Sequence, residues 1–450
     1  MQTHLRRAVG FVVTVFCVLA AIPLLRAAPA KFPLQAGADG RHLTDSAGKP
    51  FLVLGDSAWS LIAQLPETDA ARYLDDRARR GFSAIIVNLV EHKFASCAPA
   101  LRDGVQPFLK PGDFTQPNPA YFAYAHRVVA AAQRRGISVW LCPAYLGWGG
   151  GDEGWFKEIQ AGGPTVLRGY GRFVGERFAD LSNVVWMMGG DFALPPAERW
   201  TGNELAAGLR EGGARQLMTA HGGQTAATET FGDASWLAVD TVYSYVADLY
   251  RPLLAAHARQ PARPFVLIET IYEGEHNSRP EQIRRQAWCA MLGGAAGQFF
   301  GNNPIWHFDG PTLFPHKDTW QQALNGTGTR DMARLGAFFA VRPWPALVPD
   351  GDNQLVANAT NGPGHIAAAC TADRRLAVIY APADDQSSRE IVLNLDRLPG
   401  PVIATWFNPA QDTAPATPGV VLPNRGSQTV RTPGENGAGA NDWVLTLEVR

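Results

Sequence analysis

The sequence predicts an α/β protein in which a (β/α)₈ barrel is followed by a small antiparallel β-sandwich domain. Two observations lead to this fold class. Between residues 51 and 345, eight short apolar runs alternate with helical patterns, and each run is continuous, as in strands buried on both faces of a parallel sheet. After residue 345 the helical periodicity stops, and short β-type runs follow between clusters of Pro, Gly, Asn and Asp.

The eight apolar runs are the expected strands of the barrel. Their strict alternation with helices implies a parallel sheet, and eight such units imply closure into a barrel rather than an open sheet. The expected strands are residues 51–55, 84–90, 138–144, 184–190, 216–220, 239–245, 264–269 and 298–301.

Helices separate these strands, and two of them carry clear end signals. Thr68 is the expected N-cap of a helix that stops at Gly81. Asn118, followed by Pro119, is the expected N-cap of a helix that ends at Gly136. The unit between the fifth and sixth strands is short and irregular. Further helical patterns cover residues 166–174, 253–259, 281–292 and 319–341.

The β-type runs beyond the barrel predict a separate C-terminal domain. The expected division is an export signal at residues 1–30, a barrel at 31–345 and a β-sandwich at 346–450. The expected strands of the sandwich are residues 354–358, 366–370, 376–380, 391–395, 402–407 and 443–449.

The N-terminus has the pattern of a secretory signal peptide. Arg6 and Arg7 precede an apolar stretch at residues 9–25, and small residues at 27–30 offer cleavage sites. An uncleaved membrane anchor is the alternative. Cleavage would leave a periplasmic or secreted protein without membrane contact, because no later segment is long and apolar enough to span a bilayer.

Composition narrows the class of partner. Hydrophobic residues make up 46% of the chain and charged residues 18%, which is typical of a globular protein with a large core. The formal net charge of -1 gives no support for nucleic acid as a partner. Thirteen tryptophans are many for such a chain, and aromatic faces commonly stack on sugars. We expect an oligo- or polysaccharide substrate, and the oligomeric state is left open.

Two carboxylates dominate the chemistry that the sequence offers. Asp191 follows the fourth expected strand and Glu269 ends the seventh. Catalytic groups of a barrel lie at the carboxyl ends of its strands, and a buried acid costs stability unless it has a function or a partner. We expect the acid/base and nucleophile pair of a retaining glycosidase. A buried ion pair is the alternative for either acid, and Glu273 and Glu275 are rivals of Glu269.

Other polar and aromatic residues at the same strand ends are candidate substrate contacts, although each of them can equally serve packing. For Asp56, a helix cap or a loop brace is as good an interpretation. The candidates are Asp56, Trp59, Asn88, Tyr145, Trp148, His221, Tyr245, Asn302 and Trp306.

Several other chemistries lack their motifs. No His-Glu-x-x-His helix, phosphate-binding Gly loop or Gly-x-Ser-x-Gly turn is present, so we expect neither a metal nor an organic cofactor.

These segments resemble the apiosidase-like family (DUF4038, glycoside hydrolase family 140). The resemblance rests on residues 51–59, 185–191, 268–274 and 293–306, and residues 406–409 resemble the core of a collagen-binding-type domain often attached. It implies a barrel, a retaining mechanism, Asp191 as acid/base and Glu269 as nucleophile. It also implies action on apiose linkages of the pectin rhamnogalacturonan II. The loops that follow Asp191 and Glu269 differ from the family pattern. These loops shape the sugar pocket, so they bear on which sugar is bound.

Two functions follow from these patterns. The first is a secreted retaining glycoside hydrolase that acts on a plant or microbial polysaccharide. The alternative is a non-catalytic carbohydrate- or matrix-binding protein on a barrel scaffold, which would bind sugar without cleaving it.

Overall fold

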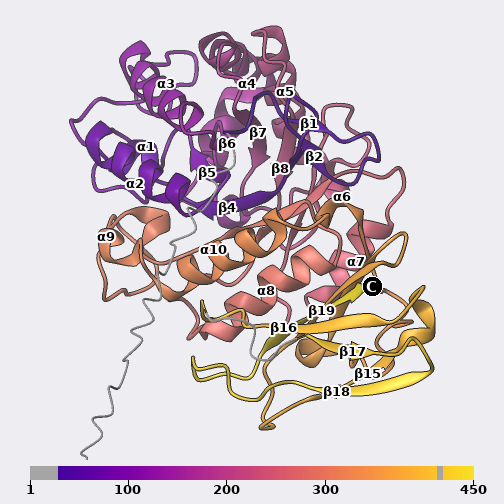
Figure 1. Cartoon of the computed structure of the whole chain (residues 1–450). Helices are drawn as coiled ribbons and strands as arrows, with labels where there is room; N and C mark the ends of the chain where they lie inside the picture. Colours follow the sequence, from indigo (N-terminus) through magenta and orange to yellow (C-terminus); the bar gives the residue numbers. More distant parts are fainter. Residues whose placement is uncertain (1–28, 413–418) are drawn as a thin grey trace, which may run out of the picture.

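A parallel barrel of eight strands forms the larger part of the molecule (Figure 1). The computed structural model describes residues 29–412 and 419–450. The barrel strands are β4 (Val53–Ser57), β5 (Ala84–Asn88), β6 (Ser138–Cys142), β7 (Val184–Gly189), β8 (Met218–His221), β9 (Asp240–Tyr243), β10 (Phe265–Glu269) and β11 (Gly297–Phe300). Every one of them overlaps an expected strand, so this part of the predicted fold is confirmed.

The strands follow the order β8-β7-β6-β5-β4-β11-β10-β9, and all their pairings are parallel. The last gap is nearly closed, because the backbone N–H groups of Ala238 and Val239 both donate to the carbonyl of Met218 at 2.9 and 3.4 Å. All eight carboxyl ends therefore meet at one rim of the barrel.

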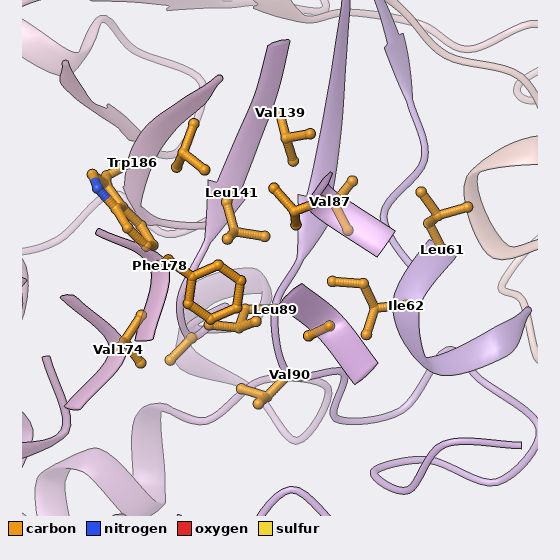
Figure 2. Close-up of a cluster of buried hydrophobic side chains, with 14 of the residues drawn as sticks. Leu61, Ile62, Val87, Leu89, Val90, Val139, Leu141, Val174, Phe178 and Trp186 are labelled. Atoms are coloured by element: carbon orange, nitrogen blue, oxygen red, sulfur yellow. The ribbon is translucent and has the colours of Figure 1, made fainter. Parts of the chain in front are cut away.

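Alternation along each strand divides the core into two layers. In β6, Val139 and Leu141 face outward toward the helices. Trp140 and Cys142, which alternate with them, face the barrel interior. Figure 2 shows the outer layer, in which Leu141 and its neighbours on adjoining strands meet Phe178. Since both faces are buried, each strand reads as a continuous apolar run.

Helices cover the outside of the barrel (Figure 1). They are α1 (Leu61–Gln64), α2 (Glu67–Arg79), α3 (Pro119–Gln133), α4 (Phe156–Phe178), α5 (Trp200–Glu211), α6 (Ala227–Phe231), α7 (Tyr250–Ala258), α8 (Pro280–Leu292), α9 (Trp320–Ala323) and α10 (Thr327–Ala340). Asn118 caps α3 as predicted, because its side chain accepts from the N–H of Ala120. The predicted cap Thr68 is wrong: α2 begins at Glu67, so Thr68 lies inside its first turn.

The C-terminal region consists of two antiparallel sheets. The strands of the six-stranded sheet follow the order β12-β13-β14-β19-β16-β17, and β15 pairs with β18 in a separate two-stranded sheet. Ile391 and Leu393 of β15 pack on Ile379 and Leu445 of the larger sheet. The strands are β12 (Leu347–Pro349), β13 (Ala367–Thr371), β14 (Leu376–Ala381), β15 (Glu390–Asn394), β16 (Val402–Phe407), β17 (Val420–Leu422), β18 (Ser427–Arg431) and β19 (Trp443–Val449).

Two details of this region differ from the prediction. Residues 354–358 form only an isolated bridge between Val356 and Leu393, not a strand. Sequence reasoning missed β12, β17 and β18, which lie at the edges of their sheets. Their residues are mostly exposed, so a buried apolar signal is weak there.

The other face of the six-stranded sheet packs against the barrel helices α8 and α10. The ring of Trp288 stacks on Tyr380 with centroids 5.9 Å apart. Beside them the buried Arg284 of α8 makes a two-pronged ion pair with Asp442 at 2.7 Å and a second pair with Asp331 at 3.0 Å. Apolar packing and buried charge pairing thus fix the C-terminal sheets to one side of the barrel.

A small antiparallel sheet lies near the N-terminal end of the described residues. It consists of β1 (Gln35–Ala36), β2 (Leu43–Thr44) and β3 (Pro50–Phe51). The predicted signal peptide lies almost wholly outside the described residues. Within residues 29–412 and 419–450, no helix combines the length and apolarity needed to cross a bilayer.

Candidate active site

A pocket of about 360 Å³ opens at the carboxyl ends of the barrel strands. This size is within the range of small-ligand sites, and this rim is where barrel enzymes place their chemistry. The lining residues are Trp59, Asn88, Phe94, Tyr145, Trp148, Glu153, Asp191, Tyr243, Tyr245, Glu269, Tyr272, Glu275, His276, Trp306, Leu313 and Phe314. The set contains carboxyl groups, phenols and large aromatic faces.

An unusual turn of the backbone delivers Asp191 to this pocket. Gly189, the last residue of β7, and the following Gly190 and Asp191 all have positive φ, at 88°, 122° and 46°. A Cβ on Gly190 would lie 2.2 Å from the ring of Tyr145, so only glycine fits there. A left-handed aspartate is uncommon and costs energy, and such strain clusters at functional sites. The surrounding contacts therefore hold Asp191 in this position.

His221, the last residue of β8, connects the two acids. Its Nδ1 accepts the backbone N–H of Asp191 at 3.1 Å, and its Nε2 lies 2.8 Å from Oε2 of Glu269. A carboxylate only accepts hydrogen bonds, so Nε2 carries the proton toward Glu269. The imidazole is 1% exposed and does not line the pocket. His221 therefore contacts the two acids from behind the pocket wall and does not contact a sugar, contrary to the prediction.

Phenol groups supply further donors to both acids. Tyr245 donates to Oε1 of Glu269 at 3.1 Å, and Tyr145 donates to Oδ2 of Asp191 at 3.4 Å. Glu269 thus has a donor on each of its two oxygens, one from His221 and one from Tyr245.

Burial and neighbouring charges shift the pKa values of Asp191 and His221. Burial, and next the charge of Glu269, raise the pKa of Asp191 to about 6 against the lowering effects of His221, Tyr243 and Tyr145. Burial opposes a charge on His221, but its bond to Glu269 and the two nearby acids raise its pKa overall. A proton is therefore retained on Asp191 at a higher pH than on an ordinary aspartate.

Most of the predicted contacts do reach the pocket. Trp59, Asn88, Tyr145, Trp148, Tyr245 and Trp306 all line it together with Asp191 and Glu269. Glu91 is buried behind the pocket wall, and its Oε2 accepts a hydrogen bond from Nδ2 of Asn88 at 3.1 Å. Because Glu91 only accepts, the amide of Asn88 is oriented with Nδ2 toward Glu91, and its Oδ1 is buried without a hydrogen-bond partner.

Besides His221, two further predicted contacts, Asp56 and Asn302, do not reach the pocket. Asp56 shares the outer face of β4 with Leu54, and there its Oδ2 bonds Nε of Arg77 and the hydroxyl of Tyr73, both at 2.6 Å. It is fully buried and serves as the brace that the sequence left as an alternative. Asn302 instead donates to Oε2 of Glu273 at 2.7 Å. The expectation that these two bind sugar is corrected accordingly.

We expect Asp56→Ala to cost roughly 3–5 kcal/mol of stability, because it leaves the Arg77 charge buried without its main partner. Urea unfolding monitored by circular dichroism measures this loss. Asp152→Ala, at an exposed ion pair with Lys157, is the matched control and should leave the unfolding midpoint essentially unchanged. A normal midpoint with lost sugar binding in Asp56→Ala would restore the binding interpretation.

The pocket also contains residues that sequence reasoning did not select. Of the two rivals of Glu269, Glu273 is held by the N–H of Gly328 at 2.7 Å and by Asn302, away from the pocket. Glu275 does line the pocket, and it was recognisable only as a second acid after the seventh strand. Tyr243, which ends β9, lies on the predicted rim beside Tyr245. The others come from loops, whose patterns carry no signal for an inward position: Phe94, Glu153, Tyr272, His276, Leu313 and Phe314.

Glu275 has the most distinctive environment among these residues. Its Oε1 accepts Nε1–H of Trp306 at 2.8 Å. Burial, together with the charge of Glu269, raises the pKa of Glu275 to about 7 against the effect of that bond. Within the described part of the chain, no group of His, Cys, Asp and Glu side chains is arranged to hold a metal ion.

A barrel with two such acids and aromatic walls at its carboxyl end defines a glycoside hydrolase type of site. Residues 37–346 match the model of the apiosidase-like catalytic domain. The chain therefore belongs to the apiosidase-like family. Residues 348–448 match a second model, described as "putative collagen-binding domain of a collagenase".

Solved structures show the same fold over nearly the whole chain. One described as a glycoside hydrolase aligns with a TM-score of 0.79 at 22% identity, covering 93% of this chain and 97% of its own. A family 5 glycoside hydrolase from Bacteroides vulgatus aligns with a TM-score of 0.80 at 20% identity, covering 92% and 93%. No curated protein sequence matches the chain.

Proposed function

We propose that the protein is a retaining glycoside hydrolase with Glu269 as nucleophile and Asp191 as acid/base. One observation carries the proposal: the two acids share a pocket and a histidine, yet are placed in different environments. Glu269 receives hydrogen bonds on both oxygens, while Asp191 has its pKa raised to about 6. A carboxyl group with a raised pKa can hold the proton that a general acid gives away, and a carboxylate held by donors on both oxygens is positioned to act as nucleophile.

The reaction divides into two displacements. In the first, the Glu269 carboxylate attacks the anomeric carbon, the bond to the leaving oxygen breaks, and Asp191 gives that oxygen its proton. In the second, Asp191 takes a proton from water, the resulting hydroxyl attacks the anomeric carbon, and Glu269 is released. His221 and Tyr245 hold the Glu269 carboxylate in place for attack.

The substrate class rests on the pocket walls and on the family. Trp59 and Trp306 line the pocket, and Trp148 at its mouth is 70% exposed, as a platform for a further sugar unit would be. We propose a plant or microbial polysaccharide as substrate, with apiose linkages of rhamnogalacturonan II as the first candidate because of the family. Secretion through the N-terminal signal belongs to the same proposal.

A proton NMR time course of one cleaved oligosaccharide tests the mechanism. We expect the first product signal to be the anomer with the configuration of the substrate, before mutarotation mixes the two forms. Release of the opposite anomer would exclude the double displacement. Saturable binding without any cleavage would favour the non-catalytic carbohydrate-binding protein instead.

A further inference from the structure

Trp148 presents its ring to solvent at the mouth of the pocket. It is 70% exposed, whereas Trp59 and Trp306, which line the same pocket, are 8% and 7% exposed. The flat apolar face of an indole suits the C–H face of a sugar ring. Trp148 can therefore bind a sugar unit that lies outside the enclosed part of the pocket.

The backbone fixes the position of this ring beside the proposed acid. The N–H of Gly149 donates to the carbonyl of Asp191 at 3.1 Å, so the loop that carries Trp148 is joined to the turn that carries the acid. The loop also returns closely upon itself, because a Cβ on Gly154 would lie 2.0 Å from the backbone nitrogen of Gly147. Trp148 is thus held on the same side of the pocket as Asp191.

Trp148 and the proposed nucleophile lie on opposite sides of the barrel rim. Trp148 follows β6 and Glu269 ends β10, and these strands are four positions apart in the strand order of the eight-stranded sheet. In the first displacement, the bond to Glu269 forms on one side of the anomeric carbon and the leaving oxygen departs on the other. The leaving sugar is therefore directed away from Glu269, past Asp191 and toward Trp148.

A second side chain of the same loop suits a polar ligand at this place. Glu153 lines the pocket and is half-buried. Within residues 29–412 and 419–450, its carboxyl group has no hydrogen-bond or ion-pair partner. Its oxygens can accept hydrogen bonds from the hydroxyl groups of a sugar that stacks on Trp148.

We propose that Trp148 and Glu153 form the subsite for the leaving-group sugar: the indole ring stacks on that sugar, and the carboxyl group accepts from its hydroxyl groups. The loop between β6 and α4 then selects the sugar on the far side of the scissile bond, and with it the linkage that is cleaved. This inference rests on the proposed function and adds its leaving-group specificity.

Two substrates with the same donor sugar separate this role from others. One is an oligosaccharide that the wild type cleaves, with a rhamnogalacturonan II fragment as the first choice. The other is the fluoride of the sugar that becomes attached to Glu269, in the anomeric configuration of the substrate; for the first candidate it is apiosyl fluoride. Fluoride departs without a sugar on the far side of the bond, so this substrate leaves the proposed subsite empty.

We expect Trp148→Ala to lower kcat/KM on the oligosaccharide by about tenfold or more, chiefly through KM, and by less than about threefold on the fluoride. Trp148→Phe, which keeps an aromatic face, should recover most of the loss. Glu153→Ala should show the same difference between substrates at a smaller size. Leu109→Ala, at a side chain that is 66% exposed outside this pocket, is the matched control and should behave as the wild type. Thermal unfolding checks that each variant is folded.

An equal loss of Trp148→Ala on both substrates would overturn the inference, because Trp148 would then act on the donor sugar or on the position of Asp191. Wild-type activity of this variant on the oligosaccharide would overturn it as well. Both results leave the glycosidase proposal standing, since the wild type cleaves both substrates. Failure of the wild type to cleave either substrate counts instead against the proposed function and removes the basis of the inference with it.

Discussion

Replacing Glu269 by Gln is expected to abolish hydrolysis, with kcat falling by about 10⁴-fold or more, because an amide cannot form the glycosyl-enzyme bond. The pocket can absorb the change. The amide oxygen of the glutamine can keep the bond from Nε2 of His221, and its NH2 group can donate to the hydroxyl of Tyr245. Release of reducing ends from a cleaved oligosaccharide measures the loss, and thermal unfolding checks that the fold is kept.

Glu273→Gln is the matched control for that experiment. Glu273 lies four residues further along the same loop and holds Gly328 and Asn302 instead of lining the pocket. This control should lose stability but keep its hydrolytic rate at temperatures where it is folded. The nucleophile assignment fails if Glu269→Gln cleaves at a rate near the wild type, or if the control is the variant that loses catalysis.

Replacing Asp191 by Ala has the second largest expected effect, and its size should depend on the leaving group. We expect a loss of about 10²–10⁴-fold on natural linkages, because general acid catalysis is removed. Substrates with very good leaving groups need no proton, so their first displacement should proceed nearly normally. Azide should then restore turnover by replacing the water that Asp191 activates, and a glycosyl azide of retained configuration should appear.

The pH profile provides an internal control for the same variant. The acid must be protonated to act, and the pKa of Asp191 is raised to about 6. Wild-type kcat/KM should therefore be high below about pH 6 and fall as the pH rises through that value. Asp191→Ala should lack this limb. An equal loss on all leaving groups, no azide rescue and an unchanged alkaline limb would together argue against the acid role.

Predicting the barrel from the sequence worked because burial on both strand faces leaves a strong local signal. The run at 184–190 contains residues that pack outward on helices, such as Trp186, and residues that pack inward, such as Met187. Both kinds must be apolar, so the strand is recognisable without knowing which face is which. The edge strands β12, β17 and β18 lack this double burial, so their residues carry no comparable signal.

Predicting the site worked for residues at strand ends and failed where side-chain direction mattered. Asp56 and Trp59 stand three residues apart, yet Trp59 lines the pocket and Asp56 faces α2 beneath Arg77. The period of two along β4 decides this, because Asp56 follows Leu54 on the outer face. Asn302 was misassigned because its partner Glu273 comes from a different strand end.

The sequence by itself determined the eight barrel units, the C-terminal β domain and the placement of Asp191 and Glu269 after the fourth and seventh strands, since these depend on local periodicity. Only the tertiary structure decided how the acids are used. It placed His221 against both of them, turned Glu273 away and brought Glu275 to Trp306. The physical reason is that hydrogen bonding and burial, which set pKa values and side-chain direction, arise between residues far apart in the chain.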